Sequence, residues 1–187
     1  MTKRSVGVSL GVLLLLGAVS APAAEPVLPF HATLQATATQ SCDALPDPTQ
    51  CEDFPNWSIE CLAKGYGQAF QAVRTGRATA LGRVVSFERG CLEPGTTGAV
   101  RSNVQMTVYA VHGGDTLTFY ANALFDFATW AAPLGPPPAT GTFTIVGGTG
   151  RYAGVRGTGT LGNVFGKGNP GWIIYLDGSL RLPVAAR

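Results

Sequence analysis

The stretch TFTIVGGTGRYAGVRGTG, residues 142–159, decides the fold of this chain. Polar and apolar residues alternate over 142–146, which predicts a strand with one buried face. Residues 156–162 are rich in threonine and glycine and predict a second strand. Glycine adopts backbone angles that other residues resist, so the glycines between the two strands predict a tight, irregular antiparallel connection. These glycines are Gly147, Gly148, Gly150 and Gly154.

The same stretch also meets the spacing of a dinucleotide-binding turn. Gly148, Gly150 and Ala153 fit the pattern GxGxxA. That fingerprint requires a long helix next, whose N-terminus holds the pyrophosphate, and then a parallel strand with an acidic residue. Residues 155–162 favour a strand instead, so we interpret the glycines as structural and expect no cofactor.

The remainder of the chain is also typical of an all-β protein. Its 25 glycines and 13 prolines leave little room for helices. Residues 30–38 alternate as a half-buried strand does, and further strands are expected over 67–73, 83–91 and 172–182. The acidic, proline-rich segment 43–55 is expected to be a loop.

The clearest pair of strands covers residues 104–111 and 116–125. Residues 112–115, His-Gly-Gly-Asp, predict the hairpin turn between them. Alternate residues from Val104 to Ala110 and from Leu117 to Ala123 are apolar, and we expect both rows to face the core. About eight or nine short strands result, a pattern that fits either a sandwich or a closed antiparallel barrel.

A resemblance favours the barrel. Residues 142–159, together with 78–83 and 114–119, resemble segments of the allene oxide cyclase and dirigent barrels and of their bacterial secreted relatives. Over residues 76–182 this resemblance implies a single antiparallel β-barrel of about eight strands with a central cavity. Ala80 stands where the bacterial relatives would have a histidine. No catalytic residue of those families is carried over to this chain.

The first 24 residues predict a signal peptide. Lys3 and Arg4 precede an apolar stretch over 6–19, and small residues follow at the expected cleavage region. A membrane anchor is the alternative, but no basic stop-transfer cluster follows. We therefore expect a secreted or periplasmic protein with one domain over 25–187. Within it, residues 25–64 form an N-terminal strand and a disulfide-rich loop, and 65–182 form the barrel.

Four cysteines support this assignment to an oxidising compartment. An even number of cysteines in an exported chain predicts two disulfides, and four cysteines allow three pairings. Our hypothesis joins Cys42 to Cys51 across a proline-rich turn and Cys61 to Cys91 between an early segment and a strand. A zinc site is the alternative, but the close C-x₂₋₄-C pairs of such sites are absent. No metal is expected.

Charge argues against two classes of partner. Lys3 and Arg4 account for the formal net charge of +2, and only 13% of residues are charged. Nucleic acids and anionic membrane surfaces attract proteins with a strongly basic face. We therefore expect neither a nucleic-acid partner nor membrane insertion of the mature chain.

No catalytic constellation is recognisable. The chain has two histidines, His31 and His112, no GxSxG elbow, and carboxylates that are scattered along the strands. If the barrel holds a ligand, polar side chains must line part of its cavity. The candidates are Tyr109, Tyr120, Tyr175, Arg101 and Glu88. The alternative places the tyrosines outside the barrel in cross-strand pairs, because the sequence does not say which row of side chains faces inward.

Three functions fit these expectations. The first is a secreted barrel protein that binds a small apolar molecule. The second is a dirigent-like or cyclase-like isomerase that orients a reactive intermediate inside the barrel. The third is a structural protein of the cell envelope.

Overall fold

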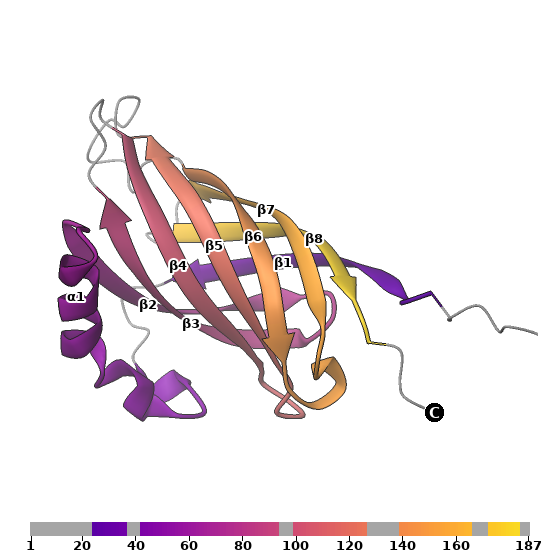
Figure 1. Cartoon of the computed structure of the whole chain (residues 1–187). Coiled ribbons are helices and arrows are strands. Elements are labelled where there is room, and N and C mark those ends of the chain that lie inside the picture. The colour runs from indigo at the N-terminus through magenta and orange to yellow at the C-terminus, as the bar shows by residue number, and fades with distance from the viewer. Residues whose placement is uncertain (1–23, 37–41, 94–98, 127–138, 166–171, 184–187) are drawn as a thin grey trace, which may run out of the picture.

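The fold is a single closed antiparallel β-barrel, shown in Figure 1. The computed structural model describes residues 24–36, 42–93, 99–126, 139–165 and 172–183. Each strand pairs with the next in the chain, and β8 pairs with β1. Closure excludes the sandwich and confirms the all-β barrel. The strands are β1 (Val27–Ala36), β2 (Gln68–Ala78), β3 (Gly82–Glu93), β4 (Ala99–Ala110), β5 (Thr116–Asp126), β6 (Ala139–Gly148), β7 (Arg156–Phe165) and β8 (Trp172–Arg181).

The two ends of the barrel differ in their connections. We call the end of the barrel where short turns join β2 to β3, β4 to β5 and β6 to β7 the lower end, and the opposite end the upper end. At the upper end, β1, β3, β5 and β7 finish and the other four strands begin. The N-terminal strand β1 lies between β8 and β2, so it is a full member of the barrel rather than a segment that precedes it.

Three phenylalanine rings fill the barrel interior towards its lower end. Phe30 and Phe143 both contact Phe119, with ring centroids 5.6 Å apart in each case, and all three are buried. The predicted inward rows of β4 and β5 surround them and are buried as expected. Phe143 packs directly on Gly159 of β7 and Gly178 of β8, where a Cβ atom would overlap its ring. The glycines of β7 and β8 therefore make room for an aromatic ring.

A substitution tests this packing. Gly159→Ala should lower the free energy of unfolding by about 1–3 kcal/mol, because the added Cβ forces Phe143 and the neighbouring backbone to shift. Gly162→Ala in the same strand is the matched control, since its Cβ would meet its nearest atom at 3.7 Å. Urea unfolding of both variants measures the difference. Equal stability of the two variants would refute the packing role of Gly159.

The glycine turn between β6 and β7 closes the lower end. Gly150 and Gly154 have φ values of 58° and 76°, in the left-handed region that favours glycine. Gly148 is needed for close packing instead, because a Cβ there would overlap backbone oxygen atoms of Thr116 and Tyr152. Gly147 needs neither, so the prediction of a special backbone angle was wrong for both Gly147 and Gly148. Gly147 lies where the register between β5 and β6 shifts by one residue.

A buried carboxylate ties this turn to the β4–β5 hairpin. Asp115 accepts hydrogen bonds from the side chain of Arg151 at 2.6 Å and from the Arg151 backbone N–H at 3.2 Å. The side-chain bond from Arg151 lowers the pKa of Asp115, so the carboxylate stays charged. Two turns far apart in the sequence are thereby held together at the lower end.

Residues 42–63 are more regular than expected. Two short 3₁₀ turns, η1 (Cys42–Ala44) and η2 (Pro48–Cys51), precede a helix, α1 (Phe54–Ala63). The predicted loop over 43–55 was wrong in this respect. Pro48 and Pro55 each lie in the first turn of a helical segment, where proline is favoured because its missing N–H has no partner to lose.

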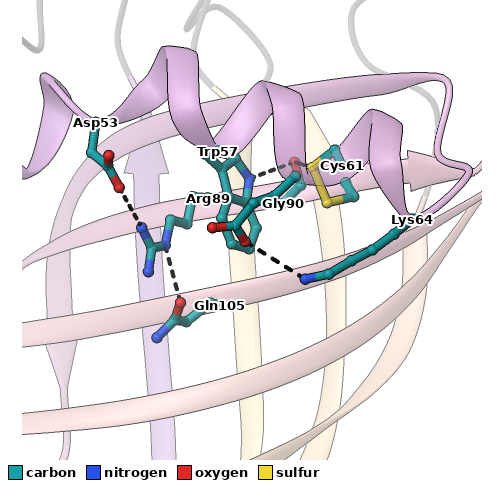
Figure 2. Close-up of polar contacts among 9 residues, drawn as sticks. Asp53, Trp57, Cys61, Lys64, Arg89, Gly90 and Gln105 are labelled. Carbon is teal, nitrogen blue, oxygen red and sulfur yellow. Dashed lines mark hydrogen bonds and ion pairs between the residues drawn. A yellow bond between two sulfur atoms is a disulfide. The ribbon is translucent and has the colours of Figure 1, made fainter.

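Helix α1 lies against the outside of β2 and β3, as Figure 2 shows in close-up. Trp57 Nε1 donates a hydrogen bond to the carbonyl oxygen of Gly90 at 3.2 Å. The guanidinium of Arg89 lies 4.6 Å from the centre of the Trp57 ring. The disulfide between Cys61 and Cys91 then fixes the helix to β3 covalently.

Both disulfides have the predicted pairing. Cys42 bonds to Cys51 within the segment of 3₁₀ turns, and Cys61 bonds to Cys91. In the part of the chain that the structure describes, no helix has the length and apolar character needed to cross a membrane.

Candidate functional site

The upper half of the barrel interior combines small and large side chains. On β4, β5 and β6, the buried residues towards the upper end include the small side chains of Ser102, Ala121, Ala123 and Ala139, together with Phe125. Small side chains do not reach the barrel axis, whereas the phenylalanines below them do. The small side chains therefore leave a gap between the larger ones in the upper half.

A cavity of about 30 Å³ lies in this upper half. Its wall is apolar except for four side chains: Arg74, Glu88, Ser102 and Asn163. The apolar part comes from six strands, β2 and β4 to β8. It consists of Phe70, Val104, Met106, Ala121, Ala123, Phe125, Ala139, Leu161 and Ile174.

Arg74 and Glu88 form a buried ion pair on the cavity wall. Arg74 Nε donates to Glu88 Oε1 at 2.6 Å, and the two side chains are only 1% and 2% exposed. Arg74 lies on β2 and Glu88 on β3, and both point inward because their neighbours Val73 and Phe87 pack on the outside with Leu45. Burying two charges costs several kcal/mol per ion, and their attraction offsets this only when the geometry is good.

A third polar group lies beside this pair. Ser86 is directly opposite Arg74 in the register of β2 and β3 and is fully buried. Its hydroxyl has no hydrogen-bond partner among the described residues. Buried hydroxyls normally find a partner, so the interior of the barrel retains hydrogen-bonding capacity near Arg74.

Of the predicted site residues, Glu88 is the one that the structure places on the cavity wall. Tyr120 and Tyr175 are 48% and 42% exposed on the outer face of the barrel. Tyr109 also faces outward, and its hydroxyl donates to Gln50 Oε1 at 2.7 Å. The side chain of Arg101, on β4, lies outside the described residues. The tyrosines therefore occupy the exterior positions that the sequence left open as the alternative.

Sequence reasoning missed Arg74, Ser102 and Asn163. A signal for Arg74 was present, because the alternate residues Phe70, Ala72, Gly76 and Ala78 of β2 are apolar or small. A single arginine within such a row must be buried with a partner or break the pattern. The matching row of β3 contains one carboxylate, Glu88, which supplies that partner.

The two histidines are not part of this site. His31 Nδ1 lies 3.1 Å from the carboxylate of Asp177 on the outer face, and His112 is exposed in the β4–β5 turn. Across the described ranges, no group of three or more histidine, cysteine and acidic side chains is placed to hold a metal ion. The chemistry available in the barrel is therefore that of a guanidinium, a carboxylate, a hydroxyl and an amide on an apolar wall.

Comparison of the chain with protein-family models, with curated proteins and with solved structures gives no match.

The energetics of the ion pair can be tested by mutation. Arg74→Met should destabilise the fold by about 3–5 kcal/mol, because it leaves the carboxylate of Glu88 buried without its partner. The double variant R74M/E88M should recover most of this loss, since two apolar side chains replace both charges. Chemical unfolding of the single and double variants measures the difference. A double variant as unstable as Arg74→Met would show that the two charges are not coupled.

Proposed function

We propose that this chain is an exported barrel protein that binds a small, mainly apolar molecule in its upper half. The observation that carries this proposal is the ion pair of Arg74 and Glu88 on the wall of an otherwise apolar cavity. Ligand sites in proteins are typically apolar with a few convergent polar groups that fix orientation. Eight-stranded barrels are wide enough to hold one small ligand.

The ion pair suggests what the ligand carries. The Arg74 guanidinium has five N–H donors, so a ligand carboxylate or hydroxyl that reaches it can share this group with Glu88. Ser102 and Asn163 also lie on this wall, where the Ser102 hydroxyl donates to the carbonyl oxygen of Ala123 and the Asn163 side-chain oxygen accepts from the Ala139 backbone N–H. The ligand expected here therefore has an apolar body and one polar end that lies against Arg74.

The size of the cavity sets a condition on binding. A volume of about 30 Å³ holds about one water molecule, so a larger ligand requires wall side chains to move. Phe70, Leu161 and Ile174 are only partly buried and pack at the edge of the main core. Outward rotation of these three side chains enlarges the cavity without disturbing the phenylalanine cluster below.

Export is part of the same proposal. The signal-peptide pattern over residues 1–24 supports it, and so do the two disulfides, because such bonds persist mainly in oxidising compartments. The Cys61–Cys91 bond joins α1 to β3, the strand that carries Glu88.

A second candidate function rests on the same ion pair. A carboxylate and a guanidinium held in an apolar cavity can stabilise charge that develops in a bound intermediate, because their electrostatic effect is stronger where water is excluded. Such a barrel would act as an isomerase that promotes ring closure mainly by orientation. Turnover of a bound molecule into an isomer of equal mass would distinguish this function from simple binding.

Native mass spectrometry of protein purified from its producing organism tests the binding proposal. Wild-type protein should retain a small molecule, and the R74M/E88M variant should lose it. Tyr120→Phe is the matched control on the outer face and should retain the molecule as wild type does.

The proposal fails if wild-type protein carries no small molecule and also binds none of a panel of medium-chain and aromatic carboxylic acids. It fails equally if R74M/E88M retains the molecule as well as wild type, since the ligand then does not depend on the ion pair.

A further inference from the structure

Two arginines face each other on the outside of the barrel. Arg77 of β2 and Arg83 of β3 are directly opposite in the register of the strands, next to the turn that joins them, and both are exposed. Side chains directly opposite in an antiparallel pair have Cβ atoms about 4.5–5.5 Å apart, and like charges at such positions destabilise the sheet. This arrangement brings two positive charges together on one surface.

No carboxylate of the described residues compensates these two charges. Arg74, Arg89 and Arg151 each form an ion pair with an acidic side chain. Arg77 and Arg83 form neither an ion pair nor a side-chain hydrogen bond within the described ranges. The two guanidinium groups therefore have their donors available for a ligand.

A groove of about 430 Å³ runs beside the two arginines. It lies at the seam where β1 and β2 pair over only four positions, Ala32–Gln35 with Thr75–Ala78. Its polar lining consists of hydroxyl, amide and guanidinium groups, and no acidic side chain lines it. The lining is Thr33, Gln35, Thr75, Gly76, Arg77, Arg83, Val84 and Val111.

We propose that this groove binds an oxyanion group, a phosphate or a sulfate, between Arg77 and Arg83. The guanidinium fork matches the oxygen geometry of such anions and donates two parallel hydrogen bonds to them. A doubly charged anion also relieves the repulsion between the two arginines, and the hydroxyl of Thr33 borders the same groove. This site is separate from the cavity of the proposed function, because Arg77 faces outward where Arg74 faces inward.

Isothermal titration calorimetry and thermal unfolding, each with inorganic phosphate and with inorganic sulfate, test this site. Sodium chloride keeps the ionic strength constant. Wild-type protein should bind one equivalent of either anion saturably, and its unfolding temperature should rise with anion concentration. The R77Q/R83Q variant should bind at least ten-fold more weakly. In chloride alone this variant should be at least as stable as wild type, because the like-charge repulsion is removed.

A second cross-strand pair provides the matched control. Arg156 of β7 and Arg181 of β8 are also directly opposite in register, so R156Q/R181Q removes the same charge from another surface. This variant should bind the anions as wild type does. Equal weakening in the two double variants would assign the effect to net charge and overturn the proposal. The absence of any saturable effect of phosphate and sulfate on wild type would also overturn it.

Discussion

The structure depends on the packing of three phenylalanine rings, one of which lies against two glycines. Phe30, Phe119 and Phe143 come from β1, β5 and β6, so their packing joins opposite walls of the barrel. Phe143 fits only because Gly159, its register partner on β7, and Gly178 on the next strand, β8, lack side chains. The ten-residue pairing of β1 with β8 closes the barrel around these rings. The glycines of β7 and β8 would weaken an isolated strand, but in the closed barrel they make room for the aromatic rings of the core.

This packing also positions the candidate site. Because the rings occupy the lower half, the cavity lies above them, where Ala121, Ala123 and Ala139 leave space between larger side chains. The ion pair of Arg74 and Glu88 lies in that half. A pair of charges in such a place is weak evidence for stability, since apolar residues of similar size often serve as well. Its presence beside the cavity therefore supports the proposed role in ligand recognition. The closed barrel and the proposed ligand site both depend on the aromatic rings lying in the lower half.

The sequence predicted the strands well where one face alone is buried. On β4 and β5, apolar and polar residues alternate cleanly, and the inward rows are those expected. On β3, residues from Val84 to Glu88 are all buried, because its outer face packs against Leu45 and the disulfide-linked segment while its inner face lines the barrel. On β3, alternation therefore did not show that Glu88 faces inward, and the matching arginine on β2 was missed with it. The tyrosines were considered as cavity residues for another reason, because alternation separates two rows of side chains without saying which row faces the inside of a barrel. The helix was missed because Pro48 and Pro55 were interpreted as loop residues rather than as residues of a first helical turn.

The central claim is that the upper half of the barrel is a ligand site organised by Arg74 and Glu88. An experimental structure of the protein purified from its producing organism tests this claim most directly. The account predicts electron density for a small molecule in the upper half, with a polar end within hydrogen-bonding distance of the Arg74 guanidinium and with Phe70, Leu161 or Ile174 displaced outward. If the upper half of the barrel contains only side chains and water in protein purified from its producing organism, the result would contradict this claim.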